Sequence, residues 1–377
     1  MVGLSRLLEQ GQYWDTCSYL FYLAVGILFS VLIRSSINLK TRRGSITAVN
    51  AFEIGAFLLV FAVLAFRSEN VGVDTASYFN MYHEASFGSI DLLRGLTFNA
   101  TTEPLYVVLE SVVKIFSDDF RVFLIFEAAV ISACLIVFVR HFFDERTSCI
   151  PLILVTNYIL FAMMLTRSAL ATSIIMIALV LSDNKRNGVS LILAVSACYI
   201  HYSMAIMLPF FILRPFVNRV LTREKFVQFV LVVIAAVVFS ILVLIFSDRI
   251  LASTKYFYKE TSAISIVSYW YIVLIALAII VLHKKSNFWS GTYGSVVLFV
   301  MYEVITLPGL MLAGVYRTER YFMLARMAVW GKLPQLIQSG HVAVLFKLAL
   351  LVGCIFYTYV YACNTSEYVG FAFSWMW

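Results

Sequence analysis

The sequence predicts an all-α polytopic membrane protein that crosses the bilayer about twelve times and forms a single transmembrane domain over residues 1–377. Its composition carries this prediction. Hydrophobic residues make up 62% of the chain, charged residues only 13%, and the mean hydropathy is +0.91. A soluble domain averages about a quarter charged residues and under half apolar ones. Because no soluble fold buries so much apolar surface, the chain must lie largely in lipid.

Apolar runs of about twenty residues, the length of a membrane-spanning helix, recur along the chain. A weaker candidate over 320–337 carries Arg320, Arg326 and Lys332. The clear candidates are 17–34, 46–66, 121–139, 226–247, 264–282, 292–313 and 341–361.

Two further apolar regions have lengths that fit neither one spanning helix nor two. Residues 150–182 are too long for one helix and carry Arg167 near their middle. Residues 188–213 are long for one helix and short for two, with His201 near their middle. The side of the membrane on which the flanking loops lie must therefore decide how many times each region crosses it.

An excess of Lys and Arg is typical of cytoplasmic loops. If all such segments are cytoplasmic, 150–182 is a hairpin with Arg167 at its outer tip, and 188–213 is a short or re-entrant hairpin with His201 at its outer tip. Both chain ends then lie outside. The alternative for 188–213 is one kinked helix, which inverts the sidedness of everything after 213. The segments with this excess are 34–45, 140–146, 183–187, 214–225 and 284–285.

The one sizeable segment outside the membrane is 67–120, on the outer face. It opens with RSENVGVDTASYFNMYHE, where charge is dense for this chain. It also contains TTEPLYVVLESVVKIF (101–116), whose apolar spacing predicts an amphipathic helix lying along the membrane.

Charged residues from six parts of the sequence gather at this outer boundary, where charges are costly and usually pair or do chemistry. Arginine forks match phosphate oxygens, which indicates a lipid-linked diphosphate ligand. A carboxylate or a neutral imidazole suits removal of a proton from a sugar hydroxyl. Tyr78 and Tyr82 offer faces for sugar rings, although tyrosine is also common at membrane interfaces. The charged set is Arg67, Asp74, Glu103, Arg167, His201, Arg317, Glu319 and Arg320.

Each of these residues also has a purely structural interpretation. Arg67 can anchor its helix at the headgroups. Asp74 can cap a helix beginning near Thr75, and Glu103 can begin a helix at Pro104. A lone His201 in apolar surroundings is often a satisfied structural histidine.

Several classes of site are missing from the sequence. No His, Cys and Asp cluster has metal-ligand spacing, and no DxD motif is present. Neither a GxxxxGK[ST] loop nor a GxSxG elbow occurs. The net charge of +7 reflects cytoplasmic Lys and Arg, not a nucleic-acid-binding face. We therefore expect no metal, no cofactor and no nucleic acid.

The ordered motifs resemble the EpsG family, whose members are relatives of Wzy-type polymerases of bacterial surface polysaccharide. FRSENVGVDTASYFNMY (66–82) fits the family pattern R-x-x-x-x-G-x-D-x-x-x-Y. The resemblance continues through EPLY (103–106), TRSALATSI (166–174), HYSMAIMLP (201–209) and YRTERYF (316–322). It covers about residues 46–325, and the C-terminal tail fits less well.

The resemblance implies a GT-C-like fold and a glycosyltransferase in the bacterial inner membrane. Such a polymerase joins repeat units carried on undecaprenyl diphosphate at the periplasmic face, so 67–120 becomes a periplasmic loop. The oligosaccharide donor and acceptor, membrane lipids and a chain-length regulator are the implied partners.

We expect a mechanism that needs no metal ion. Arg167, Arg317 and Arg320, together with Arg67, bind the diphosphate and stabilise its charge as the glycosidic bond breaks. His201 is the first candidate to take the proton of the acceptor hydroxyl, with Asp74 as the second. Glu103 orients the donor or the base.

Two other functions fit parts of the sequence. A flippase or transporter of lipid-linked sugar also needs arginines, but along a route to the cytoplasmic side. A membrane O-acyltransferase of surface glycans needs a histidine beside an acid, and along the sequence only His83 with Glu84 offers this.

Overall fold

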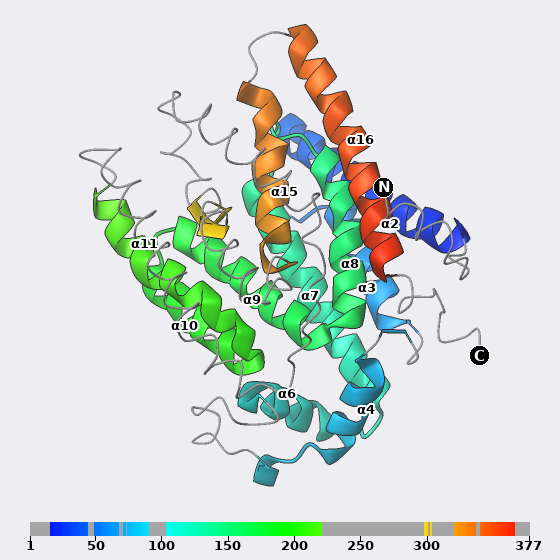
Figure 1. The fold of residues 1–377 in the computed structure, drawn as a ribbon, viewed down its shortest axis with the longest axis vertical. Helices are drawn as coiled ribbons and strands as arrows, with labels where there is room; N and C mark the ends of the chain where they lie inside the picture. Colours follow the sequence, from blue (N-terminus) through cyan, green and yellow to red (C-terminus); the bar gives the residue numbers. More distant parts are fainter. Residues whose placement is uncertain are drawn as a thin grey trace, which may run out of the picture. The chain divides into compact units, whose positions relative to one another are not determined.

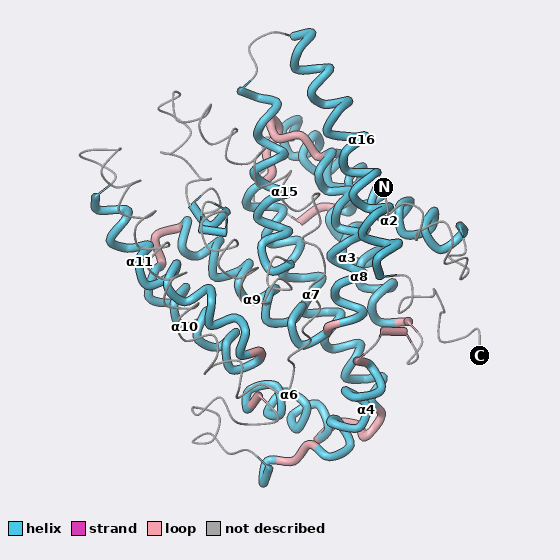
Figure 2. The backbone as a smooth tube through the Cα atoms, viewed as in Figure 1, coloured by secondary structure: helices cyan, strands magenta, loops and turns pink. Residues whose placement is uncertain are grey.

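The computed structural model describes residues 16–43, 49–67, 71–72, 74–89, 103–220, 298–300, 302–303, 320–336 and 340–365. In these ranges every regular element is a helix and none is a strand (Figures 1 and 2). Four helices within them are long and apolar enough to cross a membrane: Tyr19–Thr41, Phe120–Phe142, Thr166–Asp183 and Gly340–Tyr359. Shorter apolar helices accompany these four. The all-α prediction is confirmed for the described part of the chain.

The chain divides into two compact units. One unit contains Met1–Ile90, Tyr106–Ser173 and Trp330–Trp377, and the other contains Asp91–Leu105 and Ile174–Val329.

The first unit is a bundle of packed helices. Helix α3 (Ala51–Ala65) packs against α2 (Thr16–Arg43) and α7 (Phe120–Phe142). Helix α2 also packs against the 3₁₀ turn η2 (Ile150–Leu154) and against α8 (Val155–Met164), and α16 (Gly340–Thr365) covers the same pair.

Gly26 makes the close approach of α2 to α8 possible. A Cβ atom added to Gly26 would lie 2.4 Å from the Ile153 carbonyl oxygen and 2.3 Å from the Thr156 hydroxyl. No side chain fits there, so α2 lies directly against the backbone of η2 and the Thr156 hydroxyl of α8.

Helix α2 is longer than its predicted span. It continues through Arg43, so most of the predicted cytoplasmic loop 34–45 is helical. The extension is stabilised by an ion pair between Lys40 and Glu53, which is buried in the first turn of α3. Asn50 caps α3 by accepting a hydrogen bond from the Glu53 backbone N–H at 3.1 Å. These contacts join the ends of the two helices.

The described part of the 67–120 segment contains two α-helices. Helix α4 (Thr75–Glu84) packs against α7, and η1 (Phe87–Ser89) follows it. Helix α6 (Pro104–Lys114) lies within the stretch predicted to be helical. Lys114 Nζ donates to the His83 carbonyl oxygen at 2.6 Å, which ties the end of α6 to the end of α4.

The region 150–182 forms the predicted hairpin. Helix α8 ends at Leu165, where φ is −132° and ψ is 64°, and α9 (Thr166–Asp183) begins at the next residue. The Tyr158 and Ser173 hydroxyls lie 2.7 Å apart, and the Tyr158 hydroxyl also donates to the Ala169 carbonyl oxygen at 3.1 Å. Because Tyr158 and Ser173 stand at nearly equal distances from Leu165 along the chain, the first two turns of α9 fold back toward α8.

The second unit contains the other predicted hairpin. Helix α10 (Asn187–Ile200) ends at His201, whose backbone is extended with φ −153° and ψ 110°. The 3₁₀ turn η3 (Tyr202–Met207) and helix α11 (Leu208–Val220) follow, and both pack against α10 (Figure 1). The chain thus turns back at His201, and the single kinked helix is not formed.

Aromatic residues fill the core next to this hairpin. Phe210 stands edge to face with Phe299, with ring centroids 5.0 Å apart, and Phe299 packs on Phe322 at 4.7 Å. The Tyr302 hydroxyl donates to the Ile206 carbonyl oxygen at 2.7 Å.

The remaining span predictions have mixed outcomes. The runs 46–66, 121–139 and 341–361 correspond to α3, α7 and α16. The weaker candidate 320–337 is a 3₁₀ turn followed by α15 (Met323–Lys332) and η5 (Leu333–Leu336), not one spanning helix. The predictions that fall wholly or mostly outside the described residues are 226–247, 264–282 and 292–313.

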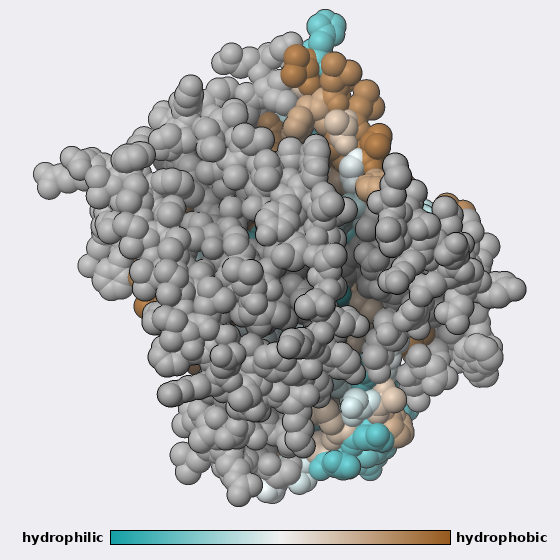
Figure 3. Space-filling view, in the orientation of Figure 1, coloured by the Kyte–Doolittle hydropathy of each residue, from teal (hydrophilic) through white to brown (hydrophobic). Residues whose placement is uncertain are grey.

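Helix α16 presents an apolar surface outward. Leu345 and Val352 are 66% and 65% exposed, and Figure 3 shows apolar residues along this helix. Lipid tails are the solvent that such a surface needs, as expected of a membrane helix.

Candidate active site

His201 and Glu103 form a hydrogen-bonded pair in the second unit. His201 Nδ1 lies 3.0 Å from Glu103 Oε1. Glu103 directly precedes Pro104, the first residue of α6, and His201 is the residue at which the second hairpin turns. The pair therefore links the residue just before helix α6 to the residue at which helix α10 ends.

This geometry fixes the chemistry of the imidazole ring. An ionised carboxylate only accepts hydrogen bonds, so Nδ1 keeps its proton and its N–H donates a hydrogen bond to Glu103 Oε1. Nε2 then carries a lone pair that can accept a proton from a substrate. The Glu103 side chain is 9% exposed and the His201 side chain 22%, so the histidine is the more accessible partner. A carboxylate behind a histidine is the arrangement of a general base.

Tyr321 lies beside this pair. Its ring stands edge to face with the His201 ring, with centroids 6.3 Å apart. Its hydroxyl is 2.6 Å from the Ser203 hydroxyl. Arg320 is the preceding residue in the chain, and its side chain is half-buried. Tyr321 thus brings the end of the YRTERYF motif, residues 320–322, to the Glu103–His201 pair, and Arg317 lies outside the described residues.

Arg167 occupies the first turn of α9 in the first unit, two residues after the hairpin turn at Leu165. Its guanidinium carbon lies 5.1 Å from the centroid of the Tyr78 ring and 5.8 Å from that of the Tyr106 ring. Both distances are typical of cation–π contacts. The side chain is half-buried, so Arg167 is held by two aromatic rings and remains partly accessible.

Arg67 is buried, unlike Arg167. It is 4% exposed, and its Nη1 donates to the Ala162 carbonyl oxygen at 3.3 Å. Burial lowers the pKa of its guanidinium, while Glu127 opposes that shift. Arg67 therefore contacts the last turn of α8 and not an open surface.

Asp74 stands at the N-cap position of α4, but its side chain makes no capping hydrogen bond. Its backbone carbonyl accepts the first helical bond, from the Tyr78 N–H at 3.0 Å. The side chain is half-buried. The capping interpretation thus holds for the backbone of Asp74 and leaves its carboxylate available for another role.

Gly72 shapes the turn that precedes Asp74. Its φ is +105°, a conformation that side chains disfavour. A Cβ atom added there would also lie 2.2 Å from the Met163 carbonyl oxygen. The glycine lets the chain pass directly over the end of α8.

Tyr78 and Tyr82 are both buried, at 2% and 0% exposure. Burial raises the pKa of the Tyr78 phenol above its usual range, while the charge of Arg167 opposes that shift. The Tyr82 hydroxyl donates to the Ser117 carbonyl oxygen at 2.5 Å, and its ring packs on Phe123 with centroids 5.4 Å apart. The observed contacts of Tyr78 are with Arg167 and with the Tyr106 ring, and those of Tyr82 are with the core.

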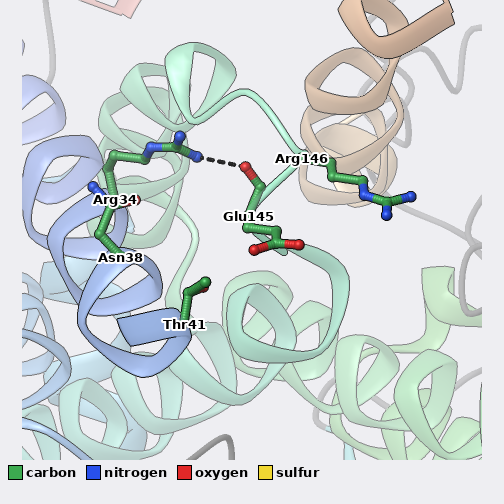
Figure 4. Close-up of a pocket in the computed structure, with 5 residues that line it drawn as sticks. All are labelled: Arg34, Asn38, Thr41, Glu145 and Arg146. Atoms are coloured by element: carbon green, nitrogen blue, oxygen red, sulfur yellow. Dashed lines mark hydrogen bonds between the residues drawn. The ribbon is translucent and has the colours of Figure 1, made fainter. Parts of the chain in front are cut away.

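A separate pocket of about 470 Å³ opens in the first unit, between α2 and the turn after α7 (Figure 4). Arg34 Nη1 donates across it to the Glu145 carbonyl oxygen at 3.0 Å. Arg34, Asn38, Thr41, Glu145 and Arg146 line it, and none is a predicted site residue. Within the described ranges, no three His, Cys, Asp or Glu side chains form a group able to hold a metal ion.

Comparison with protein families gives a match that covers most of the chain. Residues 51–373 match the EpsG family. The chain belongs to the EpsG family. The curated proteins and the solved structures contain no match. EpsG proteins are Wzy-type polysaccharide polymerases, so this chain is a polysaccharide polymerase of the glycosyltransferase type that acts on lipid-linked saccharides in a membrane.

The EpsG region contains every residue of the two clusters described above. One cluster is the Glu103–His201 pair with Tyr321, and the other is Arg167 on its two tyrosine rings. The pocket lined by Arg34 lies partly before residue 51, where the family match begins.

Glu127 is a polar residue of the site region that sequence analysis missed. It lies on α7, is 2% exposed, and its Oε1 accepts a hydrogen bond from the Tyr106 hydroxyl at 3.1 Å. The signal was present in the sequence, because a single acid within the predicted span 121–139 is unusual in a membrane helix.

Proposed function

We propose that this EpsG protein joins oligosaccharide repeat units carried on undecaprenyl diphosphate at the periplasmic face of the bacterial inner membrane. The Glu103–His201 pair is the observation that carries the proposal. A flippase forms no bond to a sugar hydroxyl and so needs no base beside one, whereas glycosyl transfer to a sugar hydroxyl does.

The acceptor is the sugar at the non-reducing end of one lipid-linked unit, and the donor is the growing glycan on its diphosphate. The acceptor oxygen forms a bond to the anomeric carbon of the donor while the bond from that carbon to the diphosphate oxygen breaks. The hydroxyl proton passes to Nε2 of His201. Glu103 holds the imidazole in the correct tautomer and stabilises the imidazolium that forms.

The leaving diphosphate gains negative charge as its bond breaks. Arg167, Arg317 and Arg320 stabilise that charge, because guanidinium forks pair with phosphate oxygens at any working pH. This role needs no metal ion, since fixed cations supply the same electrostatic stabilisation. Arg167 is suited to it because two aromatic rings hold its guanidinium in place.

The other predicted residues take supporting roles. Asp74 is the second candidate for the proton acceptor, since its half-buried carboxylate makes no capping bond. Tyr78 and Tyr82 remain candidates for glycan contact. Because both are buried in this structure, such contact requires a local movement. Arg67 remains a predicted diphosphate ligand that is equally buried. The twelve crossings and the GT-C-like fold belong to this proposal, as does a chain-length regulator as partner.

The decisive experiment compares the glycans of cells that carry His201→Ala with those of parent cells. We expect finished lipid that carries a single repeat unit, together with normal amounts of protein in the membrane. Lipid-linked repeats trapped on the cytoplasmic side would instead indicate a flippase. Loss of acyl groups at unchanged chain length would indicate an O-acyltransferase.

Sidedness can be measured independently. Cysteines placed at positions 167 and 201 should react with a membrane-impermeant thiol reagent added to the periplasmic side. Reaction from the cytoplasmic side alone would contradict a periplasmic site.

A further inference from the structure

Glu127 is a buried carboxylate that the mechanism above does not use. It lies in α7, a helix long and apolar enough to cross a membrane. An acid in such a helix is costly unless it is paired, and it usually marks a functional part of the protein. Its first partner is the Tyr106 hydroxyl, 3.1 Å from Oε1. Its second is Arg67, which acts on it through charge alone.

The first partner leads directly to Arg167. Tyr106 is fully buried, and burial raises the pKa of its phenol well above the usual range. The phenol therefore stays protonated and donates to Glu127, which fixes the orientation of the ring. That ring is one of the two on which the Arg167 guanidinium rests, at 5.8 Å.

The second partner reaches Arg167 along the backbone. Arg67 donates to the carbonyl oxygen of Ala162, three residues before the turn at Leu165. Among the described residues, its Nε and Nη2 are buried without a hydrogen-bond partner. The interaction of Glu127 with Arg67 is electrostatic, without an ion pair between these two described side chains, and it partly offsets the effect of burial on the pKa of Arg67. Arg67 thus binds the last turn of α8, a few residues before Arg167 in the chain.

We propose that Glu127 is a positioning residue that holds Arg167 for the diphosphate through the ring of Tyr106. This inference rests on the proposed function, because it assumes that Arg167 binds the diphosphate.

The test measures binding of undecaprenyl diphosphate to the purified full-length protein in lipid nanodiscs. Glu127→Gln and Tyr106→Phe should each weaken binding about tenfold, because each loosens a buried hydrogen bond that fixes the ring. Tyr106→Phe keeps the aromatic face, so it folds even if the Glu127 variant does not. Ser132→Ala, a change of similar burial on the same helix, should leave the affinity unchanged.

To distinguish positioning of Arg167 from a general structural role of Glu127, both changes are repeated in an Arg167→Lys background. If Glu127 acts through Arg167, each change should then weaken binding by less than about twofold, because coupled residues are not additive. Equal losses in both backgrounds would overturn the positioning role. So would normal binding by both single variants while Arg167→Ala binds poorly. Unchanged binding by Arg167→Ala would instead overturn the diphosphate assignment in the proposed function.

Discussion

His201 Nδ1 and Glu103 Oε1 are 3.0 Å apart, although 98 positions separate the two residues in the chain. The pair forms because a helix ends at His201 and another begins immediately after Glu103. Residues at helix breaks leave their side chains unconstrained by helical neighbours, which allows a polar pair to form within an apolar protein.

Replacement of Glu103 by Gln should lower the rate of polymerisation by about tenfold or more, because a neutral amide no longer stabilises the imidazolium. The measurement is the rate of chain extension by purified protein with lipid-linked repeat units. His83→Ala serves as the control, since His83 is an exposed histidine on α4. A Glu103→Gln protein as fast as the parent would show that the carboxylate is not needed.

Arg167→Lys should extend chains at least about tenfold more slowly than the parent, although it keeps the charge. A lysine ammonium lacks the planar fork that pairs with two phosphate oxygens and lies flat on aromatic rings. Chain length on gels of extracted glycan reports the change. Arg186→Lys, at an exposed position after α9, is the matched control and should leave chain length unaltered. Long chains from the Arg167→Lys cells would argue against bidentate binding.

Gly72→Ala should destabilise the protein by at least about 1–3 kcal/mol, the cost of a side chain in a disfavoured backbone conformation. The new Cβ atom would also meet the Met163 carbonyl oxygen at 2.2 Å. Thermal unfolding in detergent measures the loss. Gly188→Ala is the control, because an added Cβ meets no other atom within 4 Å. Equal melting temperatures for the two variants would contradict the observed turn.

Stability should fall in alkaline solution. Burial raises the folded-state pKa of Tyr78 above the unfolded value of about 10. The contribution of Tyr78 is therefore fully present below pH 10, and it is lost as the pH rises from there toward the folded-state pKa. The loss is at most about 1.4 kcal/mol per pH unit for one phenol.

Unfolding of the parent and of Tyr78→Phe, followed between about pH 8 and pH 11, isolates this contribution. The free energy of unfolding should decline less steeply in the Phe variant, since that variant has no phenol to ionise. Identical slopes would show that Tyr78 reaches solvent in the folded protein.

The two hairpins were predictable from the sequence because each apolar run has a length that does not fit a single spanning helix and has a basic residue near its middle. A run too long for one helix with Arg167 in its middle, and a run with His201 in its middle, each imply a turn. The structure has turns at Leu165 and His201. The pairing of His201 with Glu103 was not predictable, since sequence placed both only at the same membrane boundary.

Other features depended on tertiary contacts that one sequence does not reveal. The extent of α2 was underestimated because Lys40 was counted as a loop residue, whereas its ion pair with Glu53 lets the helix continue. The burial of Arg67 could not be foreseen, because an arginine after a predicted span fits an exposed anchor equally well. Glu127 was overlooked because one acid does not interrupt an apolar run.

The length of α2 bears on how the protein tolerates bilayer thickness. Its 28 residues, at about 1.5 Å each, extend roughly 42 Å, whereas a hydrocarbon core is about 30 Å thick. An apolar stretch longer than the core tilts, but the last ten residues of α2 include Arg34, Lys40, Arg42 and Arg43. The excess length of α2 therefore carries these charges beyond the hydrocarbon layer, and Lys40 joins α3 at that end.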